Sequence, residues 1–122
     1  MIIKQKNPQQ IMNGMIEKNR QLSMKVDELS ELAENMALAE RDYNMAYAKK
    51  LLELKAAGNA ITTAKDLAKG DKFVADYLFD YRVAEAIHEA CKKKIYSLNT
   101  AIETYRSLLS WEKTELRQAG VS

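Results

Sequence analysis

Two stretches of the chain, each about 50 residues long, carry apolar residues at alternating steps of four and three. This heptad spacing places the side chains on one stripe of an α-helix and is typical of a coiled-coil seam. The first stripe comprises Met15, Leu22, Val26, Leu29, Ala33, Met36, Tyr43, Tyr47 and Leu54. The second comprises Val74, Tyr77, Tyr81, Ala84, His88, Cys91, Ile95, Leu98, Ile102, Tyr105, Leu109 and Leu116. The sequence therefore predicts two long helices that pack along these two stripes, which we call the seam.

Local signals predict where the first helix begins and ends. Asn7 can cap a helix, and Pro8, the only proline of the chain, suits its first turn. Gly58 and Asn59 are expected to end the helix in a left-handed turn. We therefore expect the first long helix over about residues 8–57.

The main break in the helical pattern lies between the two stretches. Residues 58–70 form the expected apex, in which Thr62 or Thr63 caps a short turn of helix that ends at the final glycine of this segment. Asp71 is then expected to cap the second long helix, over about residues 71–118.

The length of 122 residues indicates a single domain, residues 1–122, and the charged, Pro- and Gly-poor composition is typical of long helices. The expected fold is all-α: a long antiparallel, coiled-coil-like two-helix hairpin with a short helical turn at its apex. Some apolar side chains lie off the seam and are expected to form a partner or oligomer interface. They are Leu38, Met45, Leu52, Phe79 and Trp111.

These side chains favour assembly into a homodimeric four-helix bundle, because a two-helix hairpin has only one inner seam. The alternative is that they stay partly exposed or are covered by the apex.

His88 and Cys91 are the only histidine and the only cysteine, and they lie three residues apart. A zinc site needs about four ligands, so only a dimer axis beside these residues could assemble one. A catalytic Cys–His pair needs a pocket and a third, orienting group, which the pattern does not supply. We expect neither a metal site nor a catalytic site here.

The seam predicts a structural role for His88 instead. If the hairpin folds about residue 64, His88 lies opposite Glu40, and both residues are polar interruptions of apolar stripes. We predict that they form a polar layer that fixes the register. The same register places Tyr81 near Tyr47, and it places Cys91 near Ala37.

Charge is unevenly distributed, although the net charge is only +2. Residues 49–72 contain three acidic residues and six lysines: Lys49, Lys50, Lys55, Lys65, Lys69 and Lys72. Such a basic apex could contact the phosphates of a nucleic acid. Within this window no arginine or aromatic residue accompanies the lysines, which weakens base stacking as a binding mode.

The sequence lacks the patterns of several other classes. It has no Gly-rich phosphate loop, no paired metal-binding carboxylates and no serine elbow, so we expect no enzyme activity and no cofactor. A single cysteine cannot form an internal disulfide. There is no signal-peptide pattern and no run of about 20 apolar residues, so we expect a cytoplasmic protein without membrane contact.

Several short motifs resemble a group of small, uncharacterised helical proteins of phages and prophages of Gram-positive bacteria. The motifs lie within residues 35–112, and the "AKDLAKGD" turn is the most specific of them. They are Ala39, Glu40, Arg41 and Tyr43, then Ala48, Lys49 and Lys50, "AKDLAKGD" (Ala64 to Asp71), "RVAEA" (Arg82 to Ala86) and "SLLS" (Ser107 to Ser110).

This resemblance implies a non-enzymatic accessory protein in a bacterial host cell. Such a protein would act through contacts with a phage or host protein in phage DNA metabolism. Two alternatives remain open: an inhibitor of a host protein such as a defence nuclease, in the manner of an anti-CRISPR protein, and direct nucleic-acid binding through the lysine-bearing apex.

Overall fold

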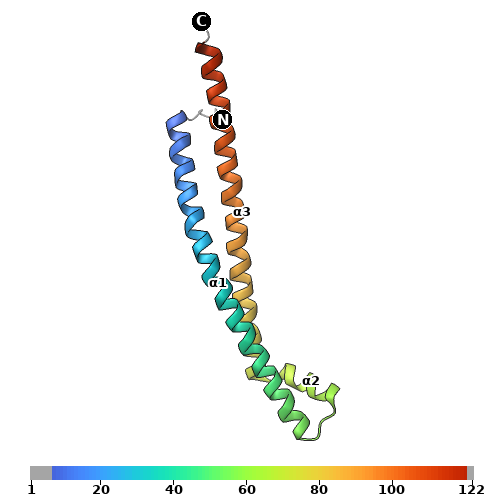
Figure 1. Cartoon of the computed structure of the whole chain (residues 1–122). Coiled ribbons are helices and arrows are strands. Elements are labelled where there is room, and N and C mark those ends of the chain that lie inside the picture. Colours follow the sequence, from blue (N-terminus) through green and yellow to red (C-terminus); the bar gives the residue numbers. More distant parts are fainter. Residues whose placement is uncertain (1–6, 121–122) are drawn as a thin grey trace. The chain divides into compact units, whose positions relative to one another are not determined.

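Three α-helices make up the chain in a computed structural model that describes residues 7–120 (Figure 1). They are α1 (Pro8–Ala56), α2 (Ile61–Gly70) and α3 (Lys72–Gly120), and residues 7–120 contain no strand. The predicted all-α class and the packing of the two long helices are confirmed. The contacts divide the chain into two compact units: unit 1 joins the part up to Glu28 with the part from Cys91 onwards, and unit 2 is Leu29–Ala90.

Helix α1 begins at a reciprocal cap, as the Asn7–Pro8 pair predicts. The backbone N–H of Gln10 donates to Asn7 Oδ1 at 2.8 Å, and the backbone N–H of Asn7 donates to Gln10 Oε1 at 3.2 Å. These two bonds satisfy donors that lack a partner within the helix. Pro8 at the first helical position removes a third such donor.

Helix α1 ends in a Schellman motif, one residue before the predicted boundary. The N–H of Asn59 donates to the carbonyl of Leu54 at 3.2 Å, and the N–H of Gly58 donates to that of Lys55 at 3.0 Å. Gly58 has a φ of +97°, which a residue with a side chain rarely adopts. The side chain of Asn59 donates a further bond to the Leu54 carbonyl at 2.9 Å.

Helix α2 starts earlier than predicted. Its N-cap is Ala60, which has an extended backbone and makes no side-chain hydrogen bond, while Thr62 and Thr63 lie inside the helix. The predicted threonine cap is therefore wrong, because the chain leaves the Schellman turn already positioned to continue as a helix. The cap of α3 is as predicted: the N–H of Val74 donates to Asp71 Oδ2 at 3.2 Å.

In unit 1 the two long helices run in opposite directions. Cys91 Sγ lies 3.5 Å from the carbonyl oxygen of Lys25, to which it can donate, and Tyr105 packs against Gly14 further towards the start of α1. A Cβ on Gly14 would lie 2.7 Å from the Tyr105 ring, so the glycine permits this close approach. The buried side chains of this unit are Ile11, Cys91, Leu98 and Ile102.

In unit 2 small and aromatic residues make the contacts. Ala64 and Ala68 are the buried residues of α2, and Val74 is buried in α3. A stacked pair of tyrosine rings joins the long helices: Tyr43 of α1 lies 6.4 Å from Tyr81 of α3, measured between ring centroids. The helices are antiparallel here too, because Lys50 of α1 lies near Asp71 at the start of α3.

The register in unit 2 differs from the predicted one. Folding about residue 64 would place Asp71 opposite Ala57, but Asp71 Oδ1 lies 3.6 Å from Lys50 Nζ. The difference is seven residues at this ion pair and four residues at the Tyr43–Tyr81 pair, because the predicted register placed Tyr81 opposite Tyr47. The cause is α2, which carries the chain back past the last turns of α1, so that α3 begins opposite Lys50 rather than level with the end of α1.

This offset separates the pairs that the predicted register joined. Glu40 is exposed and His88 is half-buried, and no hydrogen bond or ion pair joins them within residues 7–120. The charge of Glu40 instead influences the hydroxyl of Tyr81. Tyr81 lies seven residues before His88, which is about 10 Å along α3. Partial burial raises the pKa of the Tyr81 hydroxyl, and the charge of Glu40 raises this pKa further. The predicted buried polar layer is therefore not formed.

The other expected neighbours also change. Tyr81 stacks on Tyr43 rather than lying opposite Tyr47, which contacts Tyr43 from the same helix at 6.3 Å between ring centroids. Cys91 contacts the Lys25 carbonyl, twelve residues before the predicted neighbour Ala37.

Candidate interaction surface

One face of unit 2 exposes a row of large apolar side chains. The α1 residues on it lie seven apart, so they fall on one stripe of the helix. The α3 residues surround the grooves beside this stripe. We call this set the unit 2 face: Leu38, Met45 and Leu52 of α1, with Phe73, Phe79, Val83 and Ile87 of α3.

Two grooves lie on this face. One is lined by Asp42 and Phe73 among others, and the second is lined by Asn35, Asp80 and Ile87 among others. Asn35 and Asp42 lie seven residues apart on α1, and Phe73, Asp80 and Ile87 lie at seven-residue steps on α3. Because heptad-related residues share a helix face, both grooves open on the same side of unit 2.

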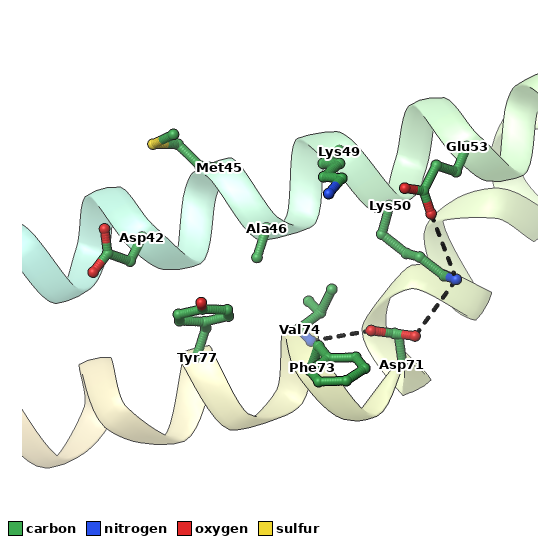
Figure 2. A pocket seen from close by; sticks show the side chains of 10 residues that line it. All are labelled: Asp42, Met45, Ala46, Lys49, Lys50, Glu53, Asp71, Phe73, Val74 and Tyr77. Carbon is green, nitrogen blue, oxygen red and sulfur yellow. Dashed lines mark hydrogen bonds and ion pairs between the residues drawn. The ribbon is translucent and has the colours of Figure 1, made fainter.

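The larger groove has a volume of about 660 Å³ and lies between α1 and the beginning of α3 (Figure 2). Tyr77 points towards α1, while Met45 points away from α3 and Phe73 remains largely exposed. The residues that line it are Asp42, Met45, Ala46, Lys49, Lys50, Glu53, Asp71, Phe73, Val74 and Tyr77.

Lys50 closes one end of this groove. Its ammonium lies 3.6 Å from Asp71 Oδ1 and 3.8 Å from Glu53 Oε2, so it links the last turns of α1 to the cap of α3 (Figure 2). Asp71 thus has two roles, because its other carboxylate oxygen accepts the cap hydrogen bond from Val74. This position of Lys50 favours a structural role over contact with a nucleic acid.

The other predicted lysines are distributed along the apex. Lys72 binds Asp76 at 3.0 Å, within α3. The remaining four are exposed and form no ion pair with residues 7–120; they are Lys49, Lys55, Lys65 and Lys69. Only Lys49 among these lines the groove that holds Phe73 and Tyr77. The fold therefore brings Lys49 close to two aromatic side chains, Phe73 and Tyr77, which follow residues 49–72 in the sequence.

All five residues predicted as a partner or oligomer interface have exposed side chains. Leu38, Met45, Leu52 and Phe79 belong to the unit 2 face, and Trp111 belongs to α3 in unit 1. The sequence reasoning missed Phe73, Val83 and Ile87. The seven-residue spacing of Phe73, Asp80 and Ile87 could have identified this second stripe, in the same way that it identified Leu38, Met45 and Leu52.

The remaining candidates for chemistry are His88 and Cys91. His88 is half-buried in unit 2, and Cys91 is buried in unit 1, where its thiol faces a backbone carbonyl. Within residues 7–120 no three side chains of histidine, cysteine, aspartate or glutamate gather as metal ligands. None of the helices in this range is long and apolar enough to span a bilayer.

Comparisons of the chain with protein-family models, with curated proteins and with solved structures give no match.

Proposed function

We propose that this chain is a non-enzymatic protein that works through protein–protein contacts, and that its first contact is with a second copy of itself. In this proposal α1 and α3 form one antiparallel hairpin with α2 at its apex. Two hairpins then associate through the unit 2 face into a four-helix bundle.

The unit 2 face is the observation that carries this proposal. Its seven side chains are between 41% and 73% exposed. At roughly 200 Å² per large side chain, they expose about 800 Å² of mainly apolar surface. The largest apolar patch on a typical monomer is about 300–600 Å², whereas each partner of a stable complex buries about 800 Å². The face is therefore large enough for a specific dimer.

The total surface supports the same proposal. The chain exposes 9271 Å², whereas a compact monomer of 13.9 kDa exposes about 6,700 Å². Of the residues from 7 to 119, only seven are buried: Ile11, Ala64, Ala68, Val74, Cys91, Leu98 and Ile102. So small a core gives a single chain little hydrophobic stabilisation, and association would supply more.

Light scattering coupled to size exclusion tests the proposal. We expect a mass of twice the 13.9 kDa of one chain, and we expect Met45→Glu or Phe73→Glu to shift the protein towards the monomer. Tyr96→Glu is a matched control, because Tyr96 is as exposed as these residues but lies in unit 1. A wild-type protein that stays monomeric at concentrations of about 100 μM would refute the proposal, since a specific dimer should form there.

Direct nucleic-acid binding is the second candidate, and the position of Lys49 beside Phe73 and Tyr77 favours it. A lysine next to aromatic rings can hold a phosphate while a base stacks. The same groove contains Asp42, Glu53 and Asp71, so its acidic groups outnumber its two lysines and an anion would be repelled. For this reason we rank nucleic-acid binding second.

Fluorescence anisotropy with a labelled single-stranded oligonucleotide distinguishes the two candidates. Nucleic-acid binding predicts an affinity that falls steeply as salt rises, because phosphate contacts release counterions. Lys49→Glu should then weaken binding more than Lys92→Glu, a charge change in unit 1. Absence of binding at low salt would leave self-association as the function.

The wider role that we propose is that of a phage or prophage accessory protein in DNA metabolism, and it rests on the sequence resemblance alone. Inhibition of a host protein such as a defence nuclease is the alternative. Purified protein added to the phage recombination reaction and to the host nuclease reaction would separate these roles. A change in one reaction, lost in Met45→Glu, would identify the relevant partner.

A further inference from the structure

We infer that the second copy packs on the unit 2 face in antiparallel orientation, with a two-fold axis at Met45. This inference specifies the geometry of the proposed self-association and rests on it. It follows from the order of apolar and charged residues along α1 and α3.

The α1 stripe is symmetric about Met45. Leu38 and Leu52 lie seven residues on either side of it, about 10 Å away along the helix. A two-fold axis at Met45 places Leu38 opposite Leu52 of the second copy, and it places the two Met45 side chains against each other. Since a two-fold interface pairs each residue with its symmetry equivalent, every apolar residue of the stripe meets an apolar residue.

The charges beside the stripe are complementary in the same arrangement. Asp42 and Lys49 lie on opposite sides of Met45, and both line the larger groove. The two-fold axis brings Asp42 of one copy next to Lys49 of the other, and the symmetry repeats the pair. Lys49 forms no ion pair within residues 7–120, so it is available for this contact. Among the described residues, Asp42 pairs only with its neighbour Arg41, at 3.3 Å.

The α3 residues fit the same axis. In unit 2 Tyr81 stacks on Tyr43 and Asp71 meets Lys50, so residues near 78 lie level with Met45. An axis there places Phe73 opposite Val83 of the second copy, and this pair is apolar.

The axis also brings two acidic groups together, Asp76 of one copy and Asp80 of the other. Lys72 offsets this repulsion, because it binds Asp76 at 3.0 Å within the same chain. The parallel arrangement would instead pack α1 of one copy on α3 of the other. It would lose both the Leu38–Leu52 pairs and the Asp42–Lys49 pairs.

Disulfide cross-linking tests the axis directly. In a Cys91→Ala background, Met45→Cys should form a self-cross-linked dimer under mild oxidation, because residues on a two-fold axis face their own equivalents. Leu38→Cys alone should not, whereas a mixture of the Leu38→Cys and Leu52→Cys proteins should cross-link. Tyr96→Cys measures random collision, and we expect several-fold less product from it.

Charge exchange provides an independent measurement. Asp42→Lys and Lys49→Asp each create two like-charge contacts per dimer, so each should raise the dimer dissociation constant about 3- to 10-fold in analytical ultracentrifugation. The protein that carries both substitutions should return to within about twofold of the wild type, because the pairs are restored.

The outcomes separate the geometry from the proposed function. A dimer that cross-links through Tyr96→Cys as well as through Met45→Cys, or that is not restored by the double charge exchange, overturns the axis but leaves self-association intact. A monomeric wild-type protein overturns both. Far-UV circular dichroism of each variant identifies any that fail to fold, and the Leu38→Cys and Leu52→Cys mixture then replaces Met45→Cys.

Discussion

Replacement of Leu98 by alanine tests whether α1 and α3 pack in unit 1. Leu98 is 2% exposed, so its side chain is enclosed by the packed helices. Leu116 lies on the same predicted seam of α3 but is 61% exposed. The two leucines therefore have the same place in the heptad pattern and opposite environments, which makes Leu116→Ala the matched control.

The expected cost follows from the atoms that are removed. Leu98→Ala deletes three carbon groups, each worth about 0.8 kcal/mol when buried, which gives a transfer cost of about 2.4 kcal/mol. The cavity that remains adds up to about 1.9 kcal/mol, at 24 cal/mol per Å³ for roughly 80 Å³. Alanine returns a few tenths of a kcal/mol through its higher helix propensity. We expect a loss of about 2.5–4 kcal/mol for Leu98→Ala, and a loss below about 1 kcal/mol for Leu116→Ala.

Urea denaturation followed by circular dichroism measures both free energies of unfolding. All proteins must be compared at one concentration, because self-association makes the apparent stability depend on concentration. If the slope of the free energy of unfolding against urea concentration is the same in variant and wild type, the loss of stability does not come from a change in the unfolded state. The packing of unit 1 would be refuted if Leu98→Ala cost less than about 1 kcal/mol, or no more than Leu116→Ala.

Three further predictions concern local features. Gly58→Ala should cost about 1–2 kcal/mol of stability, because a φ of +97° disfavours any residue with a side chain. The cost is conformational rather than steric, since no atom lies within 4 Å of the added Cβ. Gly70→Ala is the control: φ is ordinary there, so this change should cost nothing in the same urea assay. Asp71→Ala should cost about 1 kcal/mol through the lost cap of α3, and an unchanged urea midpoint would contradict this role. The hydrogen bond from Arg20 lowers the pKa of Glu17 to about 2. The ionised carboxylate therefore stabilises the folded state fully above its unfolded pKa of about 4.3. This stabilisation is lost as the pH falls from there towards about 2. A carbon-13 NMR titration should find this low pKa in the wild type, and it should rise towards the ordinary value in Arg20→Ala.

Much of the fold follows from local signals in the sequence. The pair Asn7–Pro8 begins α1, Gly58 ends it and Asp71 caps α3, because each of these signals acts within one turn of helix. The cap of α2 was predicted incorrectly because the prediction considered only signals within one turn of helix. Thr62 and Thr63 are good caps in isolation, but the turn at Gly58 already sets the direction of the chain.

The register was not predictable from the seam. A heptad pattern is unchanged when one helix slides by seven residues, so the pattern alone does not select one alignment of the two helices. The difference depends on the path of α2, which no seam residue encodes. Glu40 and His88 were paired on the basis of the wrong alignment, while the exposure of Leu38, Met45 and Leu52 needed only the periodicity of α1.

The contact between Gly14 and Tyr105 fixes the alignment of α1 and α3 in unit 1, which the heptad pattern leaves open. A slip of one heptad would move the Tyr105 ring from Gly14 to Asn7 or to Gln21, and a side chain would then occupy the space that the ring needs. Every slipped isomer therefore loses this close approach and incurs a steric penalty, although its apolar stripes still match. Gly14 is the only glycine of α1, and it thus selects one pairing among several that are otherwise nearly equal in energy.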